Sequence, residues 1–228
     1  MKVVVISLGG SLIFQDSINY NYLKRLKNLL IKYSKKTKFV IISGGGKTAR
    51  TYMEPLIKEK LSEKEVCLTG IRITRLNARF LHKFFKKNPA SNIPKSLKEV
   101  KSILQKNNIV FCGSLRYKPD NTSDGTAAEI ASYLGTDFVN LTNVDGLFTK
   151  DPRKFRDARF ISKISFEDFF KMADFAYRPG QHFVLDQSAA KIIKKHRIKT
   201  VIMNGYDLKN FENYLNNKKF IGTVIDDY

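Results

Sequence analysis

The sequence has few of the residues that would indicate a disulfide-rich, metal-binding or membrane-embedded protein. Its 228 residues include only two cysteines, Cys67 and Cys112. Two thiols give no disulfide framework and no metal-ligand spacing, so a reducing cytoplasm is the expected compartment. No segment approaches the roughly 18 apolar residues of a membrane span. The first apolar run, interrupted by Gly9 and Gly10, is too short for a signal peptide and predicts a buried first strand.

Acidic residues are scarce relative to basic ones. The chain has 41 lysines and arginines against 21 aspartates and glutamates, a formal net charge of +20. Clustered positive charge binds nucleic acid through counterion release, but here the basic residues follow expected helix faces and ends rather than one arm or a nucleic-acid motif. We therefore expect a solvated basic surface that attracts nucleotides and other anionic metabolites, with neither specific nucleic acid nor a membrane as partner.

Low-complexity stretches and long linkers are absent as well. The length and the 43% hydrophobic content suit one α/β domain comprising residues 1–228. Apolar runs alternate with amphipathic segments, which predicts a mainly parallel sheet with helices on both faces. The expected strands are 3–8, 39–42, 109–112, 138–142 and 200–203. The expected helices are 21–33, 49–60, 71–85, 96–105 and 124–134. Three more helices are expected: one capped by Ser165 with Asp168, one from Asp186 to 196, and one from Asp207. Residues 147–161 are expected to form an irregular hairpin.

Two glycine turns follow short apolar runs, SLGGS at 7–11 and SGGGK at 43–47. Glycine lacks a Cβ, so backbone N–H groups can meet a phosphate, and a helix starting after the turn adds partly positive N–H ends. Two such turns predict a site for two phosphate-bearing groups, as in phosphoryl transfer. Because parallel strands end at one edge, these turns, the 114–123 loop and the segment after 142 are expected to converge there.

The second glycine turn has two alternative interpretations. GGGKT at 44–48 resembles the end of a Walker A loop, but Ile41 stands where that motif needs a glycine, so a P-loop is not expected. A tight strand-to-helix turn without a ligand remains possible at 44–48. Arg50, one helical turn further on, would point back as a bidentate phosphate donor.

Three carboxylates follow strand ends or open helices. In TSDGTAAEIA, at 122–131, Asp124 lies beside two hydroxyls at a helix start. It could order a transfer site while N–H groups and hydroxyls hold a phosphate, or these residues could simply cap the helix. Asp186 has the same two interpretations. TNVDGLFTKDP, at 142–152, joins a strand end, a turn, an aromatic and the Asp151 carboxylate, whereas a plain hairpin would explain only its Asp-Gly turn.

Taken in chain order, seven strings resemble the motifs of the amino acid kinase superfamily, most closely its archaeal-type UMP kinases. They are LGGS, GGGKxxR, GIRITRLNA, TSDGTAA, TNVDGLFTKDP, LDQSAAKII and GTVI, and they span nearly the whole chain. The resemblance implies a three-layer αβα sandwich that transfers the ATP γ-phosphoryl group to UMP with Mg²⁺, in pyrimidine nucleotide synthesis, usually as a homohexamer. The UMP phosphate is already a nucleophile, so charge neutralisation and alignment suffice and no general base is needed.

The resemblance also implies site residues. Those for ATP are Gly9, Gly10, Ser11, Gly46, Arg50, Thr142, Asn143, Phe148 (a position often held by Tyr) and Asp151. Those for UMP are Gly45, Cys67, Gly113, Ser114, Thr122, Ser123 and Asp124. Those at the transfer step are Asp124, Asp186 and Arg50, and no protein metal ligand is expected. A basic stripe at helical spacing is left open between binding, a subunit contact and a solvated face; it comprises Arg72, Arg75 and Arg79.

The chain departs from the family pattern in three places. Ser7 stands where many members have a lysine, and the candidates for the missing charge are Lys47, Lys150, Lys191 and Mg²⁺. Cys67 stands where the family has an aspartate that grips the acceptor ribose, and a thiol cannot replace two carboxylate hydrogen bonds to a diol. The acceptor loop is longer and more basic than usual, and Arg116 or Lys118 could compensate.

These departures keep other functions open. One alternative is a related kinase of another small phosphate or carboxylate, such as isopentenyl phosphate, acetylglutamate or an amino acid. Another is a non-catalytic member that binds an anion or nucleotide, which the intact Asp124, Thr142, Asn143 and Asp151 argue against. A nucleic-acid-binding module is suggested only by the net charge.

Overall fold

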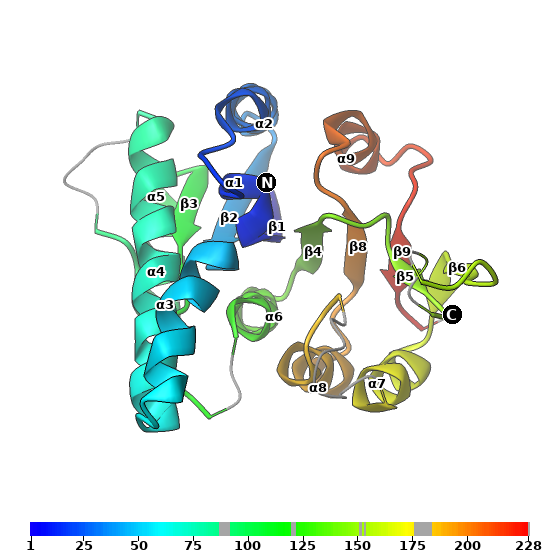
Figure 1. The fold of residues 1–228 in the computed structure, drawn as a ribbon. Helices are drawn as coiled ribbons and strands as arrows, with labels where there is room; N and C mark the ends of the chain where they lie inside the picture. The colour runs from blue at the N-terminus through cyan, green and yellow to red at the C-terminus, as the bar shows by residue number, and fades with distance from the viewer. Residues whose placement is uncertain (87–91, 120–121, 151, 153, 176–183, 228) are drawn as a thin grey trace.

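A seven-stranded sheet forms the centre of the computed structural model (Figure 1). The structure describes residues 1–86, 92–119, 122–150, 152, 154–175 and 184–227. The strand order is β3-β2-β1-β4-β8-β9-β7. Five strands run parallel, β9 is antiparallel to β8, and β7 is parallel to β9. The strands are β1 (Lys2–Leu8), β2 (Thr37–Ser43), β3 (Ile109–Cys112), β4 (Asp137–Thr142), β7 (Lys163–Ile164), β8 (Thr200–Asn204) and β9 (Thr223–Ile225).

Helices cover both faces of this sheet, which confirms the three-layer αβα sandwich with a mainly parallel centre. α2 (Tyr20–Tyr33) and α9 (Leu208–Leu215) lie on one face (Figure 1). The opposite face carries α6 (Ser123–Leu134), α8 (Gln187–His196) and α7 (Phe166–Phe175). α5 (Leu97–Lys106) packs against β3 and α6. No helix in the described part of the chain is both long and apolar enough to cross a bilayer.

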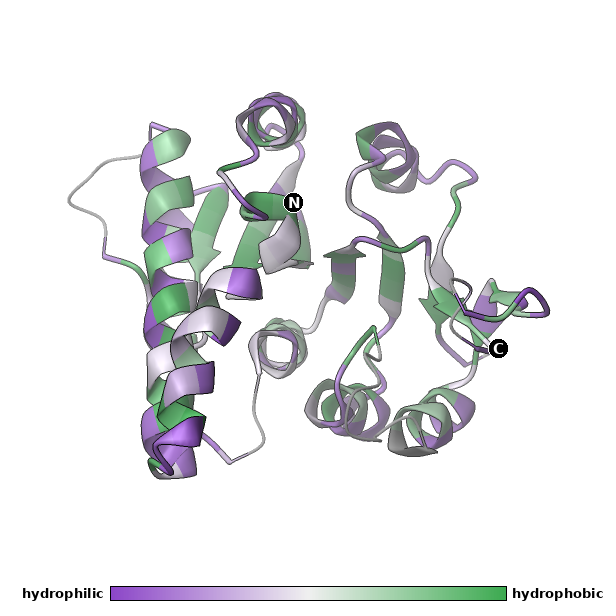
Figure 2. Cartoon of the chain, in the orientation of Figure 1, coloured by the Kyte–Doolittle hydropathy of each residue, from purple (hydrophilic) through white to green (hydrophobic). Residues whose placement is uncertain are grey.

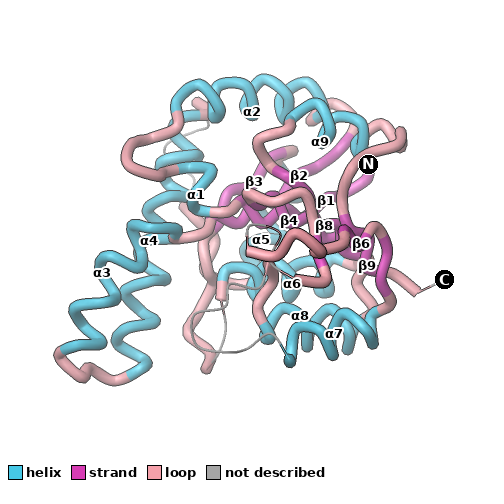
Figure 3. Tube along the Cα trace, turned by 45° about the vertical axis from the view of Figure 1, so that its right-hand side comes forward, coloured by secondary structure: helices cyan, strands magenta, loops and turns pink. Residues whose placement is uncertain are grey.

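Three more helices lie near the carboxyl ends of the first strands. α1 (Gly10–Ile13) is a single turn, and α3 (Gly46–Lys58) and α4 (Glu63–Phe84) form a helical hairpin that projects from the body (Figure 3). α4 begins eight residues before the predicted start at 71, because Ser62 and Glu65 form a capping box there. β5 (Leu147–Phe148) and β6 (Phe160–Ile161) pair as the expected hairpin.

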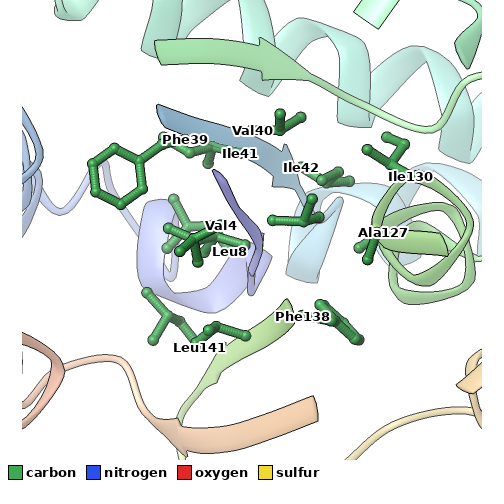
Figure 4. Packing of buried hydrophobic residues seen from close by; sticks show 14 of the residues in the cluster. Val4, Leu8, Phe39, Val40, Ile41, Ile42, Ala127, Ile130, Phe138 and Leu141 are labelled. Carbon is green, nitrogen blue, oxygen red and sulfur yellow. The ribbon is translucent and has the colours of Figure 1, made fainter. Parts of the chain in front are cut away.

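The core explains why this sheet forms. In Figure 2 the central strands are predominantly hydrophobic, as expected for parallel strands buried on both faces. On β1, Val4 and Leu8 are at most 1% exposed. Figure 4 shows Ala127 and Ile130 on the side of α6 that faces the sheet. Small residues such as Ala127 let α6 approach the strands closely, and this approach brings its first turn to the carboxyl end of β1.

Candidate functional site

The two glycine turns pack directly against each other. The Gly9 N–H donates to the carbonyl oxygen of Leu141 at 3.0 Å, and the Gly44 N–H donates to that of Leu8 at 2.9 Å. A Cβ on Gly10 would lie 2.2 Å from the nitrogen of Gly46. Side chains cannot fit at this approach, so glycine is required here by the contact between the turns as well as by any ligand.

Helix α4 supports both the second glycine turn and the acceptor loop. The Asn77 amide donates to the carbonyl oxygen of Gly44 at 2.8 Å, and the Ser43 hydroxyl donates to that of Thr74 at 2.8 Å. The Ser114 N–H in turn donates to the Thr74 hydroxyl oxygen at 3.0 Å. A Cβ on Gly113 would lie 2.6 Å from α4 backbone atoms. Helix α4 therefore holds both the second glycine turn and the acceptor loop in place.

Arg75 differs from the other two arginines of the basic stripe. Its Nε donates to the carbonyl oxygen of Ser114 at 3.1 Å, and its guanidinium also donates to that of Leu115. Partial burial lowers the pKa of Arg75 from its ordinary value. Arg72 and Arg79 are exposed. The helical spacing therefore does not give the three side chains one common environment, because Arg75 turns into the loop.

Asp124 and Ser7 bring the start of α6 to the end of β1. The Ser7 hydroxyl donates to a carboxylate oxygen of Asp124 at 2.5 Å. Ser7 is 1% exposed, and Asp124 is half-buried. Since 117 residues separate the two, the contact depends on α6 packing over β1.

Asp186 and Thr122 connect two helix starts. The Thr122 side chain caps α6 by accepting from the Gly125 N–H at 3.1 Å, and Asp186 caps α8 by accepting from the Ala189 N–H at 2.9 Å. The Thr122 hydroxyl also donates to the second carboxylate oxygen of Asp186. The predicted cap at Asp186 is confirmed, whereas Thr122, rather than Ser123 or Asp124, caps α6.

The two carboxylates share one electrostatic environment. Burial, followed by the charge of Asp186, raises the pKa of Asp124 to about 7, and the Ser7 hydrogen bond opposes this rise. Burial also raises the pKa of Asp186, against its hydrogen bonds from Thr122 and backbone N–H groups. A pair of carboxyl groups with raised pKa values at a rim of helix N-termini is typical of a functional site.

The segment after β4 lies beside the first glycine turn. The Gly205 N–H donates to the carbonyl oxygen of Thr142 at 2.7 Å, and Asn143 is exposed. The half-buried Phe148 ring packs edge-to-face on Phe160, with 5.4 Å between centroids. The Tyr206 hydroxyl donates to the carbonyl oxygen of Ser11 at 3.2 Å. Asp151 lies outside the described residues.

Other predicted residues are exposed, partly buried or paired with other side chains. Arg50 is exposed on α3, Cys67 is partly buried on α4, and Lys191 is exposed on α8. Lys47 pairs with Asp16 at 2.6 Å, and Lys150 pairs with Asp157 at 2.6 Å. Lys118 pairs with Glu129, and Arg116 is exposed. Among the described residues, the hydrogen-bond partner of the Ser7 side chain is Asp124 and not a lysine.

Sequence reasoning missed several supporting residues. Asn77 lies inside a quoted motif, but its spacing gave no sign of a bond to the glycine turn. Tyr206 and Ser7 are far from their partners in sequence, so no local pattern marks either contact. For Ser7 the available signal was its position, which the family resemblance marks as one where many members have a lysine.

The arrangement can bind two anions next to each other. The turns after β1 and β2 touch, and the starts of α6 and α8 meet through Thr122. Helix N-termini and glycine N–H groups stabilise negative charge. No group of three or more metal-ligating side chains occurs among the described residues.

Comparisons with known proteins agree with this geometry. Residues 2–204 match the Amino acid kinase family. A uridylate kinase from Thermoplasma volcanium is 33% identical over 227 residues, covering 98% of this chain and 97% of that protein. One from Pyrococcus abyssi is 33% identical over 206 residues, covering 90% and 91%. The crystal structure of uridylate kinase from Archaeoglobus fulgidus has a TM-score of 0.83 at 30% identity, covering 99% of this chain and 100% of that one.

Proposed function

The chain belongs to the amino acid kinase family, and on that premise we propose that it transfers the γ-phosphoryl group of ATP to UMP, giving ADP and UDP. Similar proteins that cover almost the whole chain are named uridylate kinases. The observation that carries the proposal is the meeting of two glycine turns beside the Asp124 and Asp186 carboxyl groups.

The first glycine turn and the segment after β4 form the donor side of this proposal. Backbone N–H groups of Gly9, Gly10 and Ser11, with Gly46, would bind the ATP phosphates. The nucleoside would lie against Thr142, Asn143, Phe148 and Asp151. The Gly9 bond to Leu141 supports this assignment, because it keeps the turn beside the β4 end.

The acceptor side comprises the loop that α4 supports. UMP would bind at Gly45, Cys67, Gly113, Ser114, Thr122, Ser123 and Asp124. The Thr74 and Arg75 contacts hold the backbone of this loop in place. Such preorganisation allows in-line transfer without covalent participation of the protein.

Asp124, Asp186 and Arg50 are the residues we assign to the transfer step. Helix N-termini and the Arg50 guanidinium would neutralise the charge of the two phosphate groups, while the carboxyl groups orient the site. Mg²⁺ bound to ATP is the cofactor we propose, and the chemistry it supplies is further charge neutralisation. Following the family resemblance, we propose that phosphate oxygens of ATP rather than protein side chains would hold the ion.

Steady-state assays with ATP and a panel of acceptors test the proposal. The panel contains UMP, CMP, isopentenyl phosphate and acetylglutamate. We expect the highest kcat/KM with UMP. Efficient turnover of another acceptor with none of UMP would refute the assignment and favour the alternative that Cys67 suggests, since a thiol at this position of α4 gives weak recognition of a ribose diol.

We also propose that residues 1–228 form one domain and that copies of the chain assemble, a hexamer being the form the family resemblance implies. One buried core extends from Val4 to Ile225, which supports a single domain. The projecting α3–α4 hairpin exposes apolar side chains that a second copy would cover; Tyr52, Ile57 and Leu76 are 58%, 59% and 58% exposed. Light scattering at several protein concentrations would measure the assembly. The cytoplasm is the compartment we propose, as for other enzymes that use ATP and UMP.

A further inference from the structure

We propose that Ser7 is a positioning residue for Asp124: its buried hydroxyl fixes the carboxylate at the transfer site and favours its ionised form. The inference rests on the proposed function for the consequence in catalysis, but the contact itself does not depend on it. Ser7 lies one residue before the end of β1, where the first glycine turn begins. It therefore joins the donor turn to the residue that opens the acceptor side.

The Ser7 hydroxyl is buried and donates to the Asp124 carboxylate. Its side chain is 1% exposed, and its hydroxyl donates to Asp124 at 2.5 Å, a length typical of a charge-assisted O–H···O⁻ bond. On β1, Ser7 is held between Ile42 of β2 and Asn140 of β4 by the sheet register. The donor is therefore fixed by the most rigid part of the fold, whereas Asp124 lies in the first turn of a helix.

The electrostatic balance at Asp124 depends on this bond. Burial and the charge of Asp186 both disfavour the carboxylate, and the Ser7 hydroxyl favours it. Among the other charges on packed elements, Glu129 on α6 pairs with Lys118 and Asp137 at the far end of β4 pairs with Lys2. On α8, Lys194 pairs with Glu167 and Lys191 is exposed. Loss of the Ser7 donor therefore leaves Asp124 protonated to a higher pH.

The hydrogen bond from Ser7 also orients the Asp124 carboxylate. A change of the Asp124 χ1 rotamer would move its carboxylate oxygens away from β1, and misplacement by about 1 Å costs up to about 100-fold in rate. The Ser7 hydroxyl opposes this rotation. Substrate binding to the glycine turns does not depend on the hydroxyl, so the Michaelis constants are expected to change less than kcat.

Two measurements on the intact protein test the inference. The first is the pH dependence of kcat/KM, which reports groups of the free enzyme. In Ser7→Ala we expect kcat at pH 7 to fall about tenfold and the acid limb to move up by about one pH unit, the equivalent of about 1.4 kcal/mol. Thr200→Val is the matched control, because it removes a fully buried strand hydroxyl that donates to the Ile198 carbonyl oxygen instead; its acid limb should not move.

The second measurement needs no activity. Urea unfolding of Ser7→Ala, Asp124→Ala and the double variant at pH 8 forms a double-mutant cycle. We expect Ser7→Ala to raise the unfolding constant about tenfold more in the wild-type background than beside Asp124→Ala. Ser7→Cys, which fills the same space with a weak donor, replaces the alanine variant if that variant folds poorly.

The outcomes separate the two proposals. An unmoved acid limb in Ser7→Ala, or equal effects of the substitution in both unfolding backgrounds, would overturn the role of Ser7. If the wild-type protein does not phosphorylate UMP, the proposed function is overturned instead. The unfolding cycle would still measure the Ser7–Asp124 contact.

Discussion

Replacing Gly10 with alanine tests how closely the two glycine turns approach. The added Cβ would lie 2.2 Å from the nitrogen and 2.5 Å from the Cα of Gly46, and 2.8 Å from the carbonyl carbon of Gly45. All three atoms belong to the backbone, so no side chain can rotate away. Normal contacts lie at about 3.5 to 4.0 Å, so the turns must separate by more than about 1 Å.

The magnitude follows from this separation. Overpacking of a buried site costs about 1–3 kcal/mol, and we expect about 3 kcal/mol here because backbone must move. For a chain of this length that lowers Tm by about 6–12 °C. Displacement of a phosphate-binding turn by about 1 Å should also lower kcat/KM for ATP up to about 100-fold.

Thermal unfolding by circular dichroism and steady-state kinetics measure both effects. Gly135→Ala is the control, because Gly135 is left-handed (φ +61°) and an added Cβ meets nothing within 4 Å. Its backbone strain costs about 1–2 kcal/mol, and activity should be unchanged. If Gly10→Ala has the same Tm and the same kcat/KM for ATP as the wild type, the close contact between the turns is refuted.

Three further predictions concern the carboxylates and the acceptor loop. The pKa of Asp124 is raised to about 7 from 3.8, so the folded state loses stability as pH rises from about 4 to 7. Asp124→Asn removes this loss, and at pH 8 its free energy of unfolding should exceed that of wild type by about 2–4 kcal/mol, although the variant should lack activity. Equal urea midpoints would contradict this prediction. Arg75→Lys loses the fork that bonds two loop carbonyl groups, so KM for UMP should rise about tenfold with little change for ATP; a larger change for ATP would argue against a loop-specific role. Asp151→Ala should weaken ATP binding, and unchanged affinity by calorimetry would remove Asp151 from the donor side.

The sequence predicted the parts of the fold that follow from local pattern. Continuous apolar runs such as 39–42 gave the central strands, because burial on both faces leaves no polar positions. The start of α4 was missed because its first turn is polar and only the Ser62–Glu65 cap marks it. β7 and β9 were missed because strands of two and three residues have no period.

The candidate site was predictable only where a motif marked it. The glycine turns and the strings around Asp124 and Thr142 were visible, and their convergence follows from parallel strand ends. The bonds from Ser7 to Asp124 and from Thr122 to Asp186 join residues 117 and 64 positions apart. Such pairs depend on how α6 and α8 pack, which no single segment encodes.

The position of β9 has a consequence for synthesis. This strand, Thr223–Ile225, lies between β8 and β7, and the Thr223 hydroxyl oxygen also accepts from the Leu147 N–H at 2.7 Å. A growing polypeptide on the ribosome therefore cannot join β7 to the sheet or fix the start of the β5–β6 hairpin until translation has passed residue 225. The half built around β1 to β3 has its own strands much earlier, and domains form from the N-terminus as they emerge. We expect stalled nascent chains ending near 220 to resist protease in that first half and to be cut within 143–150, so ATP binding would be acquired only after residue 225 has left the ribosome.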